Sequence, residues 1–250
     1  MGIRRGSIST PIIADGLVFN MDAANRASYI PDATTSFNTL DLSQSGSLQD
    51  TGMYSSENEG TWVFDGVDDY IDTGNTISFN YNDPFTVSAW VKANAVSGYK
   101  TIYYKFDTSI SGGRGIIIRL YSVCGSCINI VYFDLYSTNA GSTSTRKRIT
   151  TGTGTIVDHD IWYLLTATYD GSGVGSGMKI YLNEVPQTVT VTQDNLQSGD
   201  ITNSLNALIG ATYTPSYVFN GNIANSLIYN RALSSNEVLH NYNALKGRFS

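Results

Sequence analysis

Four glutamates are the residues whose type could support acid–base chemistry: Glu57, Glu59, Glu184 and Glu237. Hydrolysis of a glycosidic bond needs a pair of carboxylates that flank the bond, and alternate positions of one strand would place such a pair on one face. Glu57 and Glu59 lie in a Ser- and Asn-rich stretch without strand character, while the other two stand in a turn and at a helix start. The positions of the glutamates therefore argue against an enzyme.

The chain also has a Cys-x-x-Cys motif, Cys124-Gly125-Ser126-Cys127, and two histidines, His159 and His240. Zinc needs about four ligands, and these residues are too few and too scattered to supply them. The apolar runs on both sides of the motif instead predict a β-hairpin with Gly125-Ser126 as its turn. We expect reduced cysteines inside a cell, although the sequence does not fix their redox state, and both histidines are expected to be solvent-exposed.

The composition of the 250-residue chain favours strands over helices. Ser, Thr, Asn and Gly supply 99 residues, whereas Asp, Glu, Lys and Arg supply 14%, well below the usual quarter or so. Helix surfaces favour long charged side chains, so a mostly helical fold is excluded. The apolar content of 41%, with 17 Tyr and 9 Phe, is enough to form a large core.

The charge and hydropathy patterns exclude several classes of partner. A net charge of −6 provides no basic field that would attract phosphates, so nucleic acid is not an expected partner. No apolar run reaches the ~18 residues of a membrane span. The start of the chain, residues 1–7, lacks the apolar segment of a signal peptide and the Ser or Thr of a myristoylation signal. We therefore expect a protein that is neither exported by the common route nor bound to a membrane.

Apolar and polar residues alternate along much of the chain. In 85–92, Phe, Val, Ala and Val occupy one face, while Thr, Ser, Trp and Lys occupy the other, which is the period of a half-buried strand. Turn pairs such as Asp65-Gly66 and Asn220-Gly221 separate such runs. The pattern predicts an all-β fold, a two-sheet antiparallel sandwich. Further strands are expected at 16–22, 61–65, 101–106, 115–123, 128–136, 161–169, 178–185, 188–192, 207–212 and 223–229.

One short helix is expected near the C-terminus. Ser234 and Glu237 have the spacing of a capping box, and Gly247 provides a stop signal. The predicted apolar stripe of this helix is formed by Val238, Leu239, Tyr242 and Leu245.

The sequence also predicts the domain organisation. Residues 1–14 lack alternation and are expected to form an N-terminal arm, and residues 15–250 a single domain. Residues 23–60 show little periodicity, so we expect a long connection that is functional or disordered.

Six stretches between residue 16 and the C-terminal helix carry a family resemblance. They are Gly16–Asp22, Val63–Ile71, Phe85–Val91, Trp162–Gly171, Lys179–Asn183 and Gly221–Ser234. Together they resemble the laminin-G-like branch of the concanavalin A-like lectin/glucanase superfamily. The resemblance implies a jelly-roll sandwich in a family whose members bind glycans, bind proteins or serve as structural modules. It also implies that a hydrolase of this fold would carry two Glu and an Asp at alternate positions of one strand, which this chain lacks.

The resemblance also implies a Ca²⁺ site at one edge of the sandwich, with acidic residues at positions that are Ala224 and Asn225 here. Ala224 supplies no oxygen and Asn225 only a neutral one, so the affinity for Ca²⁺ should be low. Asp22 and Asp65 are the remaining candidates, with hydrogen bonding of turns as their alternative role. No cofactor is expected to be required, and a structural Ca²⁺ is the less favoured alternative.

Glycan binding would need exposed aromatic faces with polar partners. Most Tyr in a sandwich only pack with the hydroxyl at the surface, so each single candidate is weak. The basic trio 146–148 is either a solvated strand end or a contact with an acidic neighbouring subunit. The candidate tyrosines in or beside loops are Tyr99, Tyr103, Tyr104, Tyr213 and Tyr217.

A second resemblance concerns the biological setting. Residues 17–25 and 242–249 are similar to parts of sandwich proteins that tailed bacteriophages encode as virion components. This implies a non-enzymatic virion structural protein, a homo-oligomeric capsid decoration, fibre or spike component that is made in the host cytoplasm. Host surface glycans are a further candidate partner, and the alternatives are a free carbohydrate-binding lectin and a divergent glycoside hydrolase. Other virion proteins would be bound through the arm, by Arg4, Arg5, Ile12 and Ile13.

Overall fold

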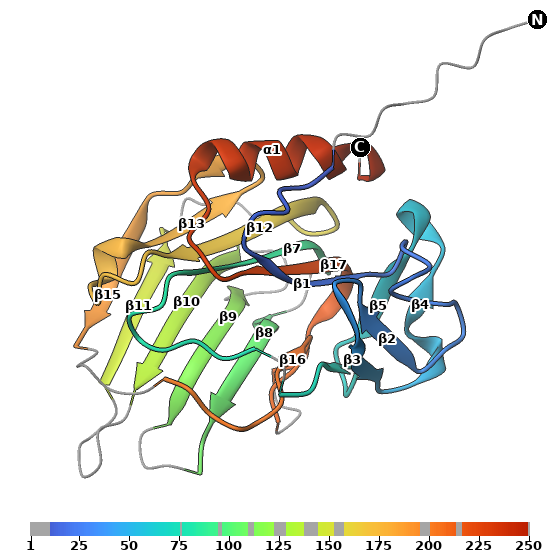
Figure 1. Ribbon diagram of the computed structural model, residues 1–250, viewed down its shortest axis with the longest axis horizontal. Helices are drawn as coiled ribbons and strands as arrows, with labels where there is room; N and C mark the ends of the chain where they lie inside the picture. The colour runs from blue at the N-terminus through green and yellow to red at the C-terminus, as the bar shows by residue number, and fades with distance from the viewer. Residues whose placement is uncertain are drawn as a thin grey trace, which may run out of the picture.

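The computed structural model describes residues 11–75, 77–94, 97–109, 113–122, 129–137, 145–152, 158–195, 201–213 and 217–249. Within them, two antiparallel sheets pack face to face and an α-helix lies on the outside of one of them (Figure 1). The predicted two-sheet antiparallel jelly-roll sandwich with one short C-terminal helix is therefore confirmed. In these ranges, no helix has the length and hydrophobicity that crossing a membrane requires.

Sheet A brings the two ends of the domain together. Its strands are β1 (Leu17–Asp22), β4 (Tyr54–Ser55), β5 (Thr61–Asp65), β7 (Phe85–Ala93), β12 (Trp162–Tyr169), β13 (Met178–Leu182), β14 (Val185–Pro186) and β17 (Asn220–Tyr229). They follow the order β14-β13-β12-β7-β17-β5-β4, and β1 pairs with β17 beside this path. Leu17 lies opposite Tyr229 in that pair, so the first described strand is held by the last.

Sheet B contains the longer hairpins. Its strands are β2 (Thr35–Asn38), β3 (Asp41–Leu48), β6 (Ile71–Asp72), β8 (Gly98–Asp107), β9 (Arg114–Ser122), β10 (Asn129–Ser137), β11 (Thr145–Thr151), β15 (Val189–Asp194) and β16 (Leu208–Ile209). The order is β15-β11-β10-β9-β8-β16-β6-β3-β2. The consecutive strands β8 to β11 lie side by side (Figure 1), and β8, β9 and β10 lie where the sequence predicts strands, whereas β11 was not predicted.

The alternative that 23–60 forms a disordered connection is wrong. This stretch contains the hairpin of β2 and β3, the short strand β4 and the 3₁₀ turns η1 (Thr51–Met53) and η2 (Glu57–Glu59). The buried positions of β2 are the polar Ser36 and Asn38, and the large buried apolar residues Tyr29, Leu48 and Met53 are too far apart to give an apolar period. Ser28 and Asn38 are fully buried and donate hydrogen bonds to the carbonyls of Phe37 and Val18, which replaces apolar packing with satisfied polar contacts.

The core lies between the two sheets and is rich in aromatic rings. Phe85 is fully buried and stacks on Phe79 with ring centroids 4.8 Å apart. The same ring meets Phe133 of sheet B edge-on at 6.0 Å. Such pairs add to the free energy that area burial alone provides, and here they tie the sheets to each other.

The C-terminal helix α1 (Ser235–Leu245) begins at the predicted capping box. Ser234 accepts a hydrogen bond from the backbone N–H of Glu237, and the Glu237 carboxylate accepts one from the backbone N–H of Ser234. The predicted apolar stripe is wrong at Leu239, which is 41% exposed. The buried position is taken by Asn241, because its side-chain amide donates to the Tyr229 hydroxyl and accepts from the Ile13 backbone N–H.

The 3₁₀ turn η4 (Lys246–Arg248) fixes the end of the chain to sheet A. Arg248 donates to both carboxylate oxygens of Asp22, at 3.0 and 2.9 Å, and to the carbonyl of Gly60. The next residue, Phe249, stacks on Trp90 with ring centroids 4.2 Å apart. Together, α1 and η4 cover part of the outer face of sheet A (Figure 1).

We predict an acid-dependent loss of stability at the start of α1. Hydrogen bonds from Arg231 lower the pKa of Glu237 from 4.5 to about 2. Because the folded pKa lies below the unfolded one, the contribution of Glu237 is complete above about pH 4.5 and is lost as the pH falls toward 2. In Glu237→Gln, urea unfolding should therefore show a smaller decrease of the unfolding free energy across this range.

Glu184→Gln is the matched control, because Glu184 lies in the turn between β13 and β14, where it is half-buried. It should follow the wild-type pH profile. Identical profiles for wild type and Glu237→Gln would contradict the assignment.

Candidate functional site

The outer face of sheet B is set by the alternation of side chains along its strands. Phe133 and Leu135 of β10 belong to the core, so Tyr132, Asp134 and Tyr136 point to the opposite side. The neighbouring strands β8 and β9 continue the same surface. We call this surface the tyrosine face, and its aromatic residues are Tyr70, Tyr99, Tyr104, Phe106, Tyr121, Tyr132, Tyr136, Tyr213 and Tyr217.

Ring contacts connect the tyrosines of this face. Tyr99 lies 4.5 Å from Tyr121 and 5.2 Å from Tyr217, measured between ring centroids. On the β16 side, Tyr104 meets Tyr213 edge-on at 5.7 Å. These contacts fix the rings in position, so little side-chain entropy remains to be lost when a ligand stacks on them.

Asp134 is the buried charge at the centre of the β9–β11 part of the tyrosine face. Its side chain is fully buried and accepts hydrogen bonds from Nε and, at 2.9 Å, from Nη2 of Arg148. Arg119 donates to the same carboxylate at 3.4 Å, and its guanidinium lies 4.3 Å from the ring centroid of Tyr99. The carboxylate therefore positions two arginines over aromatic rings, an arrangement that stabilises both cations.

A pocket of about 340 Å³ opens beside β6 and β16. Tyr213, 42% exposed, forms part of its wall, and its hydroxyl donates to the carbonyl of Asn206. Burial, and next the charge of Asp72, raise the pKa of Tyr213, so its hydroxyl stays protonated near neutral pH. The pocket is lined by Gln49, Asp68, Tyr70, Asp72, Leu208, Thr212 and Tyr213.

A second pocket, of about 320 Å³, lies next to the other end of the tyrosine face. Tyr99, Lys100 and Tyr217 contribute to its wall. Burial lowers the pKa of Lys100 to about 8.

The predicted tyrosines differ in their exposure to solvent. Tyr99, Tyr213 and Tyr217 are partly exposed on the tyrosine face, and Tyr104, which is 5% exposed, packs against Tyr213. Tyr103 is a wrong candidate, because it is 2% exposed and packs in the core between the sheets. A register shift between Thr101 and Tyr103 breaks the alternation of β8 and turns its ring inward.

Sequence reasoning missed the strand residues of this face. Arg119, Tyr121, Tyr132 and Asp134 stand at alternate positions of β9 and β10, opposite the core residues. The sequence predicts both strands, and the positions that alternate with the core residues could have identified these outward side chains.

The proposed metal residues do not form one site. Asp22 is paired with Arg248, and Asn225, 1% exposed, accepts a hydrogen bond from the Trp90 backbone. Asp65 lies opposite residue 220 of β17, five residues or roughly 16 Å along the strand from position 225. Ca²⁺ needs convergent oxygens, so these three residues cannot share an ion.

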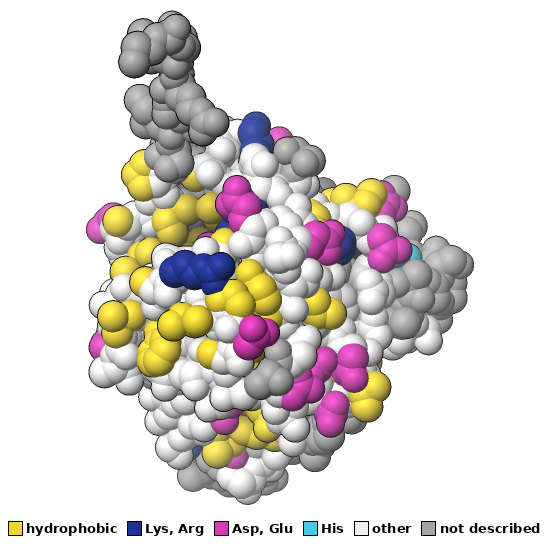
Figure 2. Space-filling model, turned by 90° about the vertical axis from the view of Figure 1, so that its right-hand side faces the viewer, with side chains coloured by type: hydrophobic (Ala, Val, Ile, Leu, Met, Phe, Trp, Pro, Cys, Tyr) yellow, Lys and Arg dark blue, Asp and Glu magenta, His cyan; other side chains and the backbone are white. Residues whose placement is uncertain are grey.

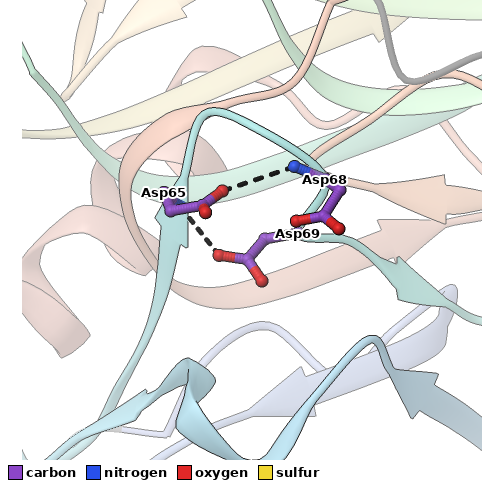
Figure 3. Close-up of side chains that lie close together, drawn as sticks. All are labelled: Asp65, Asp68 and Asp69. Carbon is purple, nitrogen blue, oxygen red and sulfur yellow. Dashed lines mark hydrogen bonds between the residues drawn. The ribbon is translucent and has the colours of Figure 1, made fainter.

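Asp65 lies instead in an acidic turn with Asp68 and Asp69, whose carboxylates approach within 4.8 Å of one another (Figure 3). Asp65 accepts from the backbone N–H of Val67 and Asp68, and Asp69 accepts from that of Asp65. Burial raises the pKa of Asp69 to about 6, against the lowering effect of that last hydrogen bond. The carboxylates thus serve the turn, and Asp68 also borders the pocket beside β6.

The remaining surface differs in character from the tyrosine face. On the side that carries β2 to β5, Figure 2 shows scattered hydrophobic side chains and a group of acidic ones. Exposed apolar residues include Ile30, Leu40 and Leu42.

The remaining predicted residues are those of the arm and of the Cys-x-x-Cys motif. Arg4, Arg5, Cys124 and Cys127 fall outside the described residues. Ile12 and Ile13 pack against the sheet A residues under α1, and the Tyr229 hydroxyl donates to the Ile13 carbonyl. The part of the arm that the structure describes is therefore held against the domain.

These observations define a two-sheet β-sandwich with an aromatic, charged outer face. The family model Laminin_G_3, described as the concanavalin A-like lectin/glucanases superfamily, matches residues 65–239. The chain belongs to this family. No curated protein sequence matches the chain.

Solved structures of low sequence identity share the fold. The binding domain of Paraclostridial Mosquitocidal Protein 1 is 15% identical with a TM-score of 0.61, over 92% of this chain and 52% of that one. Domain 4 of the arabinanase AbnA from Geobacillus stearothermophilus, in complex with arabinotriose, is 18% identical with a TM-score of 0.55, over 89% and 96%. Trypanosoma rangeli sialidase in complex with sialic acid is 13% identical with a TM-score of 0.60, over 96% and 36%. The chain thus spans about half of the mosquitocidal chain and about a third of the sialidase chain.

We predict that the Asp134 carboxylate holds the arginines in place. Asp134→Ala should lower the unfolding free energy in urea by about 3 kcal/mol, because Arg148 is left without its buried counter-charge. The double variant Asp134→Leu/Arg148→Met should recover most of this loss, since neither charge remains buried.

Asp41→Ala is the control, because Asp41 is exposed and its side-chain bonds stay within its own turn. An Asp134→Ala variant within about 0.5 kcal/mol of wild type would show that the pair is not structural.

Proposed function

We propose that this chain is a non-catalytic, lectin-like domain that binds a carbohydrate on the tyrosine face. The observation that carries the proposal is the pocket beside β6, in which the rings of Tyr70 and Tyr213 lie near the carboxylates of Asp68 and Asp72. Sugars present apolar C–H faces that stack on aromatic rings, and hydroxyls that donate to carboxylates. The pocket offers both kinds of contact.

The size of the pocket and its place in the fold support this proposal. A volume of about 340 Å³ lies at the lower end of the range for small-molecule sites, roughly 300 to 1,000 Å³. The arabinanase domain of the same fold is a complex with arabinotriose, which makes a saccharide a reasonable class of ligand here. Part of the other outer face, that of sheet A, is covered by α1 and η4.

The positions of the glutamates favour binding over hydrolysis. All four belong to the described residues, and none lies on a strand of sheet B. Glu57 forms an ion pair with Lys92, and Glu237 caps α1. Asp134, the buried carboxylate of the tyrosine face, is held by two arginines, which suits a structural role rather than that of a proton donor.

We predict that Tyr213→Ala weakens glycan binding about tenfold, because the exposed ring of the pocket is lost. Ligands would first be identified on an array of plant, bacterial and animal glycans. The affinity of each variant for the best ligand would then be measured by calorimetry. Leu239→Ala is the matched control, since Leu239 is 41% exposed but lies on α1.

Unchanged affinity in Tyr213→Ala, or no binding to any glycan, would overturn the proposal. Release of reducing sugar from the bound glycan by the wild-type protein would instead support the hydrolase alternative.

We further propose that the domain is a virion component and that its N-terminal arm attaches it to other virion proteins. This rests on the similarity of 17–25 and 242–249 to phage sandwich proteins. Ile12 and Ile13 pack on the domain itself, so we assign attachment to the preceding residues, which include Arg4 and Arg5.

A chain lacking residues 1–10 is predicted to fold but to be missing from purified particles. Immuno-electron microscopy of particles from the source organism would detect the full-length chain, and a melting curve would check the fold of the truncated one. Unlabelled particles, or equal labelling by both chains, would contradict this role and favour a free lectin.

A further inference from the structure

We infer that the β9–β11 half of the tyrosine face binds an acidic sugar through a carboxylate of the ligand. This inference rests on the proposed glycan binding and names its ligand class. Arg119 comes from β9, and Arg146 and Arg148 come from β11; these two strands flank β10, and all three arginines stand on the outer side of sheet B. Asp134 lies between them and is the one carboxylate that the described residues pair with these arginines.

The charge balance of this area is positive. Arg148 and Asp134 neutralise each other through two hydrogen bonds. Arg119 reaches the same carboxylate only at 3.4 Å; its side chain is 12% exposed, and within the described part of the chain its buried Nε has no hydrogen-bond partner. Arg146 contacts the neutral groups of Gln193 and Tyr136. Two guanidinium charges are thus left largely uncompensated on a protein whose net charge is −6.

Aromatic rings contribute to the positions of both arginines, for Arg119 in addition to its bond with Asp134. The Arg119 guanidinium lies 4.3 Å from the Tyr99 centroid and 5.7 Å from that of Tyr132. The Arg146 guanidinium lies 5.3 Å from the ring centroid of Tyr136 and donates a hydrogen bond of 2.8 Å to the Tyr136 hydroxyl. A planar guanidinium held in this way keeps N–H donors for a carboxylate, and the neighbouring rings supply the stacking surface that a pyranose needs.

The two halves of the tyrosine face therefore select different groups. Across sheet B, one row of outward residues runs from Arg148 through Asp134, Ile117 and Tyr104 to Asp72 near the pocket. The Asp72 end is acidic and suits sugar hydroxyls as donors, whereas the arginine end suits an anion. An oligosaccharide with a carboxylate on one residue would match both ends.

The test compares acidic sugars with their neutral esters. Trigalacturonic acid, a hyaluronan tetrasaccharide and sialyllactose would each be titrated by calorimetry against the corresponding methyl ester, which keeps the skeleton and removes the charge. At least one acid should bind about tenfold more tightly than its ester, because hydrogen bonds between charged groups are the stronger ones. The preference should shrink as salt rises from about 50 to about 500 mM.

Arg119→Gln and Arg146→Gln should remove this preference, singly in part and together almost completely, while affinity for the neutral esters stays unchanged. Lys179→Gln is the control, since it removes one positive charge from an exposed position of sheet A. Arg148 is left intact because its loss would leave Asp134 buried without a partner. Melting curves would confirm that each variant is folded.

The outcomes separate the two proposals. Equal affinity for every acid and its ester overturns the acidic ligand class but leaves glycan binding intact, as does a preference that survives in the double variant. Failure of the wild-type protein to bind any sugar, acidic or neutral, overturns both.

Discussion

The two-residue period of the long strands in sheet B is the constraint on which the rest of the structure depends. Ile118 and Leu120 of β9 are buried in the core, so Ile117, Arg119 and Tyr121 must face outward. A slip of one residue in register would bury Arg119 and expose Ile118 and Leu120. The packing of the sandwich and the composition of the tyrosine face are therefore specified by the same pairing.

The charged network of the tyrosine face is compatible with this packing because its buried member is satisfied. Asp134 lies between Tyr132 and Tyr136 on the outer side of β10 and is fully buried. An unpaired carboxylate there would lower the stability of the fold. Arg148 removes that cost and leaves Arg119 and Arg146 stacked on tyrosines. Neighbouring apolar, aromatic and ionic groups give a surface that is rigid before a ligand arrives, which lowers the entropy lost on binding.

Sheet A uses its outer face differently. Helix α1, the η4 turn and residues 11–13 pack over it, with Phe249 on Trp90 and Arg248 on Asp22. Segments from both ends of the chain thus close this side. The family fold by itself does not assign a function, but coverage of one face and exposure of rings on the other direct the search for a ligand to sheet B.

The sequence by itself determined the all-β class, the positions of strands such as β5, β7, β9, β10 and β12, and the capping box of Ser234 and Glu237, because these follow from local periodicity and local hydrogen bonds. The tertiary structure decided which tyrosines share a surface. A bulge in β8 turns Tyr103 into the core, and the pairing of β9 with β10 places Arg119 beside Tyr132 and Asp134. The tertiary structure also formed strands in 23–60, where the buried side chains of Ser28 and Asn38 donate hydrogen bonds to backbone carbonyls and no apolar alternation is present. Contacts of this kind join residues far apart in the chain, and no local pattern encodes them.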